Sequence, residues 1–205
     1  MEVFVRVAEQ NRALRETTRQ AIERAAVRIF ARHGFAASSI RHIAEEAGLS
    51  IGSIYRHYAS KEVLFDDLLK QAAAGLEAVS DTLSGDGDPL ALVRGFTHDF
   101  LSDLAGDQEA AEFYLVINQG FLSDTPAGTA ARLAAEQGSL WEAFAKLIRR
   151  GQTSGQFADG DPEQLTAYYF AMLSGIANMR LVIQDALTDS GADVVLRLLT
   201  GEGNP

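Results

Sequence analysis

The stretch SIRHIAEEAGLSIGSIYRHYASK, residues 39–61, constrains the fold of this chain more than any other. From Ile40, apolar side chains recur at the helical spacing i, i+3, i+4 and i+7, and charged residues lie between them. Ser39 suits the N-cap of this helix, and Gly48 follows its last apolar position, where positive φ ends a helix at little cost. Ser50 can cap another helix two positions later. The pattern therefore predicts a helix, a tight turn and a second helix.

The second helix is short, and its first residues are small or polar. Gly52 and Ser53 lie near its start, whereas Ile54 and Tyr58 are the residues expected to anchor it inward. Such a helix can place its N-terminal end in a major groove, where the base edges lie. A further helix begins near Lys61, whose ammonium group lies beside free backbone N–H groups that favour an anion. We expect that anion to be a DNA phosphate.

This run resembles the DNA-binding domain of the TetR (tetracycline repressor) family of bacterial transcriptional regulators. It departs from the family pattern at Ile51, where many members carry a basic or polar residue, and at Tyr58, where many carry phenylalanine. Ile51 favours an apolar contact such as one with a thymine methyl group. The residues that carry the resemblance are Ile40, Arg41, Ile43, Ala44, Ala47, Gly48, Leu49, Ser50, Gly52, Ser53, Ile54, Tyr55, His57, Tyr58, Ser60, Lys61 and Glu62.

The resemblance implies a set of DNA-contacting residues. Positions matching Tyr55, His57 and Lys61 contact the DNA backbone in the family, and those from Ser50 to Ser53, with Arg56, lie near the bases. A phenol, an imidazole and cations along one face also fit phosphate contacts on chemical grounds. The candidates are Ser39, Arg41, Ser50, Ile51, Gly52, Ser53, Tyr55, Arg56, His57 and Lys61.

The charge of the chain is divided unevenly along its length. The net charge is −10, yet residues 12–61 hold 9 basic and 4 acidic side chains, so the acid lies mainly in the second part. This asymmetry would orient the protein on a phosphate backbone.

The pattern predicts an all-α chain of two domains. Residues 12–62 form a three-helix helix-turn-helix domain whose first helix spans about 17–32 and is ended by Gly34, residues 63–83 form a connecting helix, and residues 84–205 form a helical bundle for effector binding and dimerisation. Three of the four prolines follow a residue that can cap a helix, which marks helix starts. The predicted helices of the bundle span about 89–104, 108–122, 126–150, 162–183 and 192–200.

The helices near 162–183 and 192–200 are the predicted homodimer interface. The first carries a bulky stripe that includes Tyr169 and Leu173 beside a stripe of small residues that includes Ala171 and Gly175. Small side chains let another helix approach closely, so two subunits can form a four-helix interface, as is usual in the resembled family. The alternative, which the pattern leaves open, is that both stripes are intramolecular core.

The resemblance also implies an apolar cavity in the second domain for an unknown small-molecule effector. Aromatic and Met side chains at helical spacing are more often core than ligand contacts, so each candidate has a structural alternative. The candidates are Phe96, His98, Phe100, Phe113, Tyr114, Asn118, Phe121, Trp141, Tyr168, Tyr169 and Met172.

Other classes of protein fit the sequence less well. The four histidines lack metal-ligand spacing and the chain has no cysteine, so we expect no metal, no cofactor and no enzyme activity. No run has the length of a membrane span and the first residues lack a secretory pattern, which favours the cytoplasm. We therefore predict a dimeric regulator, most simply a repressor released by a ligand, that binds a palindromic double-stranded DNA operator. The alternative is a helical dimeric interaction protein that does not read DNA.

Overall fold

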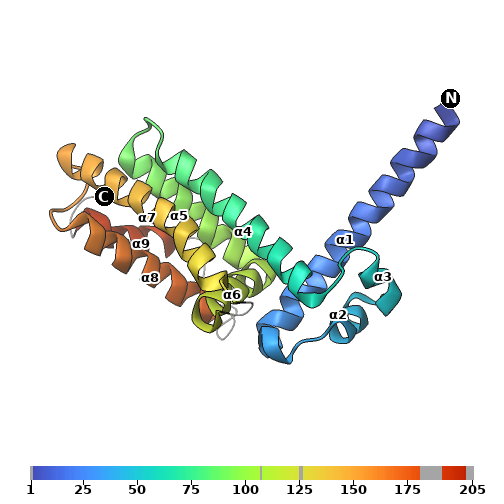
Figure 1. The fold of residues 1–205 in the computed structure, drawn as a ribbon. Helices are drawn as coiled ribbons and strands as arrows, with labels where there is room; N and C mark the ends of the chain where they lie inside the picture. The colour runs from blue at the N-terminus through green and yellow to red at the C-terminus, as the bar shows by residue number, and fades with distance from the viewer. Residues whose placement is uncertain (1, 107, 125–126, 181–190, 202–205) are drawn as a thin grey trace. The chain divides into compact units, whose positions relative to one another are not determined.

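The computed structural model describes residues 2–106, 108–124, 127–180 and 191–201, without the side chains of residues 2–11, 121–123 and 136. Within these ranges the regular elements are all α-helices, which confirms the predicted fold class (Figure 1). The chain divides into two compact units, residues 1–70 and 71–205. Every helix in the described ranges is too short or too polar to cross a lipid bilayer.

The first unit contains α1 (Glu2–Ala37), α2 (Ile40–Ala47), α3 (Ile51–Tyr55) and the first turns of α4 (Lys61–Leu83). Helix α1 packs against α2, and α2 packs against α3. The apolar stripes of these helices meet in one core, which buries Ile22, Ala25, Ala26, Ile29, Phe30, Ile40, Ile43, Ala44, Ile54, Tyr58, Leu64, Phe65 and Leu68.

The predicted helix-turn-helix is confirmed by its caps. The Oγ atom of Ser39 accepts a hydrogen bond from the backbone N–H of His42 at 3.2 Å, which satisfies a free donor at the start of α2. Gly48 ends α2 with a left-handed φ of 66°. Ser50 then caps α3 by accepting from the N–H of Ser53 at 3.1 Å.

Helix α1 begins earlier than predicted, whereas Gly34 interrupts it where its end was predicted. It begins at Glu2 rather than near residue 17, and it continues to Ala37 across a single non-helical residue, Gly34, with φ 72° and ψ 162°. The early start was missed because residues 2–16 contain no clear apolar stripe. They also contain no glycine or proline, however, and good helix formers predominate among them. Helix propensity therefore extends α1 beyond the segment that the core requires.

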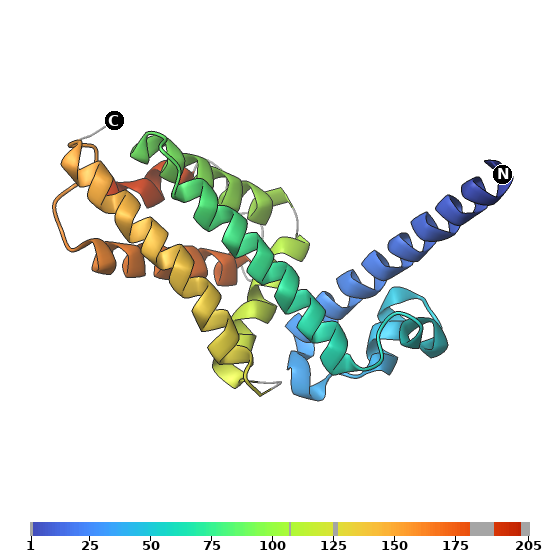
Figure 2. The same cartoon turned by 45° about the horizontal axis from the view of Figure 1, so that its top comes forward.

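The second unit contains the rest of α4, then α5 (Pro89–Gly106), α6 (Gln108–Ser123), α7 (Thr129–Thr153), α8 (Pro162–Arg180) and α9 (Ala192–Thr200). Helix α7 packs against α6 and α8, and α9 packs against α5 and α8, as Figures 1 and 2 show. The shared core buries Leu83, Val93, Leu101, Leu140, Phe144, Leu147, Ile148, Phe157, Tyr169, Phe170, Leu173, Ala192, Val195, Leu196 and Leu199.

Two of the three proline-marked helix starts are confirmed. Asp88 accepts from the N–H of Ala91 at 2.9 Å at the start of α5, and Asp161 accepts from the N–H of Gln164 at 2.9 Å at the start of α8. The predicted start at 126 and the predicted end at 183 lie outside the described residues, and α7 is described from Thr129 onward.

A close packing contact at the end of α7 yields a stability prediction. A Cβ atom at Gly151 would overlap the ring of Phe157, whereas one at Gly138 on the same helix would meet nothing within 4 Å. We expect Gly151→Ala to lower the free energy of unfolding by about 1 to 3 kcal/mol because the ring must move. Gly138→Ala, the matched control, should raise it by up to about 1 kcal/mol through helix propensity. Urea unfolding measures both, and equal effects would contradict the packing argument.

Candidate nucleic-acid interface

Helix α3 presents apolar side chains to solvent on one face and is anchored by the other. Ile51 is 45% exposed and Tyr55 is 55% exposed, whereas Ile54 is fully buried. Gly52 lies between Ile51 and Tyr55 in the sequence. A Cβ atom at Gly52 would have the Ser50 Oγ atom as its one neighbour within 4 Å, at 3.9 Å. The outer face of α3 is therefore free of intramolecular contacts at its centre, as a helix that enters a groove requires.

Ser53 positions the guanidinium group that follows α3. Its Oγ atom accepts a hydrogen bond from Nη2 of Arg56 at 2.6 Å. Arg56 is exposed, so its remaining N–H donors face solvent. The predicted base-proximal residues thus include a cation held at a defined place beside α3.

Ser39 and Arg41 occupy the start of α2. The hydroxyl of Ser39 is engaged in capping α2. Arg41 is exposed and pairs with Glu45 one turn later at 3.0 Å. An exposed i, i+4 pair is weak, so a phosphate can compete with Glu45 for this guanidinium group.

Lys61 has an internal role that the sequence did not reveal. Its Nζ atom donates to the backbone carbonyls of Phe35 at 2.7 Å and Ser38 at 2.9 Å, and it lies 4.3 Å from the centroid of the Phe35 ring. These contacts use two of its three N–H donors and hold the start of α4 against the end of α1. In this structure Lys61 is thus a structural cation of the first unit.

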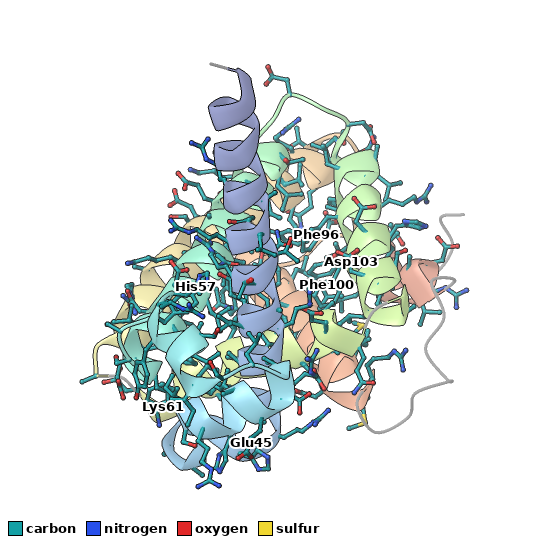
Figure 3. The ribbon with its side chains drawn as sticks, turned by 90° about the vertical axis from the view of Figure 1, so that its right-hand side faces the viewer. Glu45, His57, Lys61, Phe96, Phe100 and Asp103 are labelled. Carbon is teal, nitrogen blue, oxygen red and sulfur yellow. The ribbon has the colours of Figure 1, made fainter. Side chains whose placement is uncertain are left out.

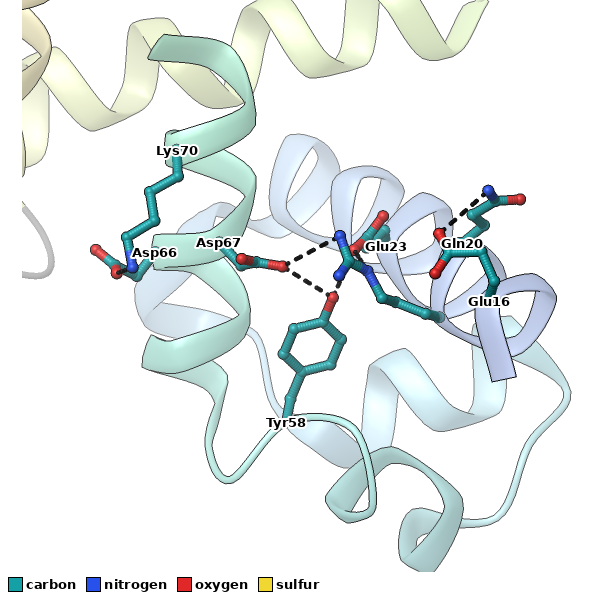
Figure 4. Close-up of polar contacts among 8 residues, drawn as sticks. Glu16, Gln20, Glu23, Tyr58, Asp66, Asp67 and Lys70 are labelled. Atoms are coloured by element: carbon teal, nitrogen blue, oxygen red, sulfur yellow. Dashed lines mark hydrogen bonds and ion pairs between the residues drawn. The ribbon is translucent and has the colours of Figure 1, made fainter. Parts of the chain in front are cut away.

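Tyr58 belongs to a polar network that joins α1 to α4 (Figure 4). Its hydroxyl donates to Oε1 of Glu23 at 2.5 Å and lies 3.2 Å from Oδ2 of Asp67. Arg19 neutralises both carboxylates, with Nε 2.8 Å from Glu23 and Nη2 3.7 Å from Asp67. Burial, reinforced by the hydrogen bond to Glu23, raises the pKa of the Tyr58 phenol. The phenol, in place of the family's usual phenylalanine, therefore gives the loop before α4 a polar link to both helices.

His57 lies beside the middle of α1 in Figure 3, whereas Lys61 and Glu45 lie nearer its C-terminal end. It lines a pocket together with Ser53 and Arg56 and with Arg12 and Arg15 of α1. The two α1 arginines were not among the predicted DNA contacts, because the resemblance begins only at Ile40. The excess of basic residues over 12–61 was the signal that pointed to them.

Most of the predicted effector contacts lie in or against the core of the second unit. Tyr169 is fully buried, and its hydroxyl is 2.7 Å from Oγ1 of Thr97. The Tyr114 hydroxyl lies 2.7 Å from Oγ of Ser174. Half-buried members are Phe96, Phe100, Phe113, Tyr114, Asn118, Trp141 and Met172, and the side chain of Phe121 is outside the described residues.

Two of the predicted effector contacts do not face the interior. His98 is 57% exposed and Tyr168 is 65% exposed. On α5, Thr97 takes the inward position, so the neighbouring His98 points outward. On α8, Tyr169 takes the inward position, and Tyr168 points away from the core.

Comparison with known proteins places these features in a family. Residues 22–68 match the family described as "Bacterial regulatory proteins, tetR family". The HTH-type transcriptional repressor KstR2 of Mycobacterium tuberculosis is 38% identical over 71 residues, which are 34% of this chain and 36% of that protein. The HTH-type transcriptional regulator TtgR of Pseudomonas putida is 28% identical over 181 residues, which are 84% of this chain and 83% of that protein. Residues 22–68 belong to the TetR family of bacterial regulatory proteins.

The family assignment confirms the resemblance predicted from residues 40–62. The match to KstR2 spans about a third of that protein. A solved structure of the MbdR regulator from Azoarcus sp. CIB extends the likeness of fold to the whole chain, with a TM-score of 0.76, 21% identity and coverage of 91% of this chain and 100% of that one. Membership of the family supports a DNA-binding regulator over an enzyme.

Proposed function

We propose that this TetR-family protein represses transcription by binding a palindromic DNA operator as a homodimer. The observation that carries the proposal is the exposed face of α3, where Ile51 and Tyr55 flank Gly52 and Ser53 holds Arg56. Apolar side chains can contact thymine methyl groups, and a positioned guanidinium can bind guanine or phosphate. Because bacterial DNA lies in the cytoplasm, we place the protein there.

The proposed interaction is tested by whether the purified protein selects a two-fold symmetric site from random DNA. Two recognition helices related by a two-fold axis read two half-sites about one helical turn apart or a multiple of it. A helical dimer that does not read DNA, the competing function, would select no site.

The outer face of α8 supports the homodimer. Its bulky stripe is largely core, since Tyr169 and Leu173 are buried, whereas Ala171 and Gly175 are exposed one turn apart. Tyr168 and Met179 flank these small residues as exposed apolar side chains, and α9 adds the exposed Val194. An apolar face with small residues at its centre fits a second copy of the same helix.

A single residue on this face tests the dimer. A Cβ atom at Gly175 meets nothing within 4 Å, so Gly175→Arg leaves the fold of one subunit intact while placing a charge at the proposed interface. We expect sedimentation velocity to show a shift toward monomer, with dimer affinity reduced at least about tenfold. Gly95→Arg on α5 is the matched control, because its Cβ atom is equally unobstructed. A Gly175→Arg protein that stays as dimeric as the control would contradict the interface.

We further propose that an apolar effector with one hydrogen-bond acceptor binds among α5, α7 and α8. Phe96, Phe100 and Trp141 pack against the core without being fully buried. The indole N–H of Trp141 is buried and has no acceptor among the described residues, so it can donate to a ligand. An effector releases DNA only if it binds better to a conformation unsuited to the operator, and a coupling of about 1 to 3 kcal/mol corresponds to roughly 5- to 150-fold weaker binding. A compound that binds here without altering operator affinity would contradict this mechanism.

A further inference from the structure

A pocket in the first unit lies between the N-terminal half of α1 and the helix-turn-helix. Its volume is about 720 Å³. Most of its lining side chains on α1 are exposed, so the pocket opens to solvent. It is lined by Arg12, Leu14, Arg15, Glu16, Thr18 and Arg19 of α1 and by Leu49, Ser53, Arg56 and His57.

The pocket is strongly basic. Four of its lining residues are arginines and one is a glutamate, whose carboxylate accepts from Gln20 at 3.4 Å. Arg19 pairs with Glu23 and Asp67, and Nη2 of Arg56 donates to Ser53. Arg12 and Arg15 have no ion-pair or hydrogen-bond partner among the described side chains. Two guanidinium groups are therefore available to an anion, and their fork of donors matches phosphate oxygens.

The pocket shares Ser53 and Arg56 with the surface that we propose reads DNA. A duplex whose major groove holds α3 must carry its phosphate strands past the ends of that helix, so a basic pocket bordering α3 lies in reach of a strand. Leu14, the exposed large apolar side chain among its lining residues, is 66% exposed.

We propose that Arg12 and Arg15 bind a phosphate group of the operator backbone at the flank of each half-site, which makes the N-terminal half of α1 a second DNA-contacting element. This inference rests on the proposed operator binding. It assigns the DNA backbone as the occupant because the pocket is cationic and continuous with α3.

The test compares operator binding by the full chain and by Arg12→Gln/Arg15→Gln over a salt series. We expect the double variant to bind roughly tenfold more weakly at low salt, and the slope of log affinity against log salt to fall by about 1 for each arginine removed. The site preference should not change, because a phosphate contact carries no base information. The control is Arg24→Gln, an exposed arginine of α1 that does not line the pocket.

A second measurement locates the contact on the DNA. Single phosphates of the selected site are replaced by uncharged methylphosphonates, and each is assayed against both proteins. We expect at least one flanking position where the replacement weakens the natural chain and has little further effect on the double variant, which is the coupling that a direct contact produces.

The outcomes separate this inference from the proposed function. Suppose that the natural chain selects a palindromic site but the double variant keeps the same salt slope, or that Arg24→Gln loses as much operator affinity as the double variant. Either result would show that the pocket does not bind DNA, and the operator function would stand. If the double variant and the methylphosphonate have strictly additive effects on affinity at every position, the inference that Arg12 and Arg15 bind a phosphate is also overturned, and the operator function again stands. If the natural chain selects no DNA, both the pocket inference and the proposed operator binding are contradicted.

Discussion

Gly52→Leu is expected to weaken specific DNA binding strongly while leaving the protein folded. Gly52 lies at the centre of the exposed face of α3, between Ile51 and Ser53, and a Cβ atom there meets no protein atom closer than 3.9 Å. Leucine also has a higher helix propensity than glycine, by roughly 0.8 kcal/mol, so the first unit should be no less stable. In a groove, by contrast, the added side chain occupies the space of the base edges. Operator affinity should fall on the order of 100-fold.

The measurement pairs fluorescence anisotropy on a labelled operator with thermal unfolding. Gly75→Leu on α4 is the matched control, because its Cβ atom meets nothing within 4 Å and it lies outside the helix-turn-helix. The control should bind DNA as the natural chain does. If Gly52→Leu retains full affinity, α3 does not enter the groove and the reading helix is misassigned.

Lys61→Met is expected to lower the free energy of unfolding by about 2 to 4 kcal/mol. It removes two charge-assisted hydrogen bonds, to the carbonyls of Phe35 and Ser38, and a cation–π contact with the Phe35 ring. Methionine preserves the length of the apolar stem, so the loss reports the ammonium group. Urea unfolding at constant salt measures the change.

Lys70→Met on the same helix is the control, because among the described residues the exposed Lys70 pairs with Asp66 alone, at 2.9 Å. Lys70→Met should lower the free energy of unfolding by less than about 0.5 kcal/mol. An opposite pattern, in which Lys61→Met leaves stability unchanged and lowers the salt slope of DNA binding by about 1, would return Lys61 to the phosphate role that the family resemblance implies.

The helix-turn-helix could be predicted from sequence because its signals are local. Ser39, Gly48 and Ser50 act on backbone groups within a few residues of themselves, so their spacing alone specifies where α2 ends and α3 begins. The same holds for Asp88 and Asp161 in the second unit. Capping chemistry needs no knowledge of the tertiary fold.

The internal role of Lys61 could not be predicted in this way. Its partners Phe35 and Ser38 lie 26 and 23 residues earlier in the chain, and their carbonyls are brought to it only by the packing of α1 against α4. A helix-start lysine looks the same in sequence whether it faces a phosphate or a carbonyl. The Tyr58 network has the same origin, since Glu23 is 35 residues away.

Which effector candidates face the interior was harder to predict than the caps of the helix-turn-helix, because helical spacing shows which residues share a face but not what that face packs against. Tyr168 and Tyr169 are adjacent, and only the packing of α8 decides that Tyr169 is buried while Tyr168 faces solvent. The early start of α1 was missed for a related reason. Apolar periodicity detects helices that cover a core, and the basic face around Arg12 and Arg15 covers none.

Selection of DNA from a random pool by the purified protein, followed by a salt series on the enriched site, tests the central claim most directly. We expect a two-fold symmetric site, bound at least about 1,000-fold more tightly than random DNA, with log affinity falling linearly as log salt rises. Enrichment of no sequence at low salt, with binding to random DNA equal to binding to any selected pool, would contradict the claim that α3 reads an operator.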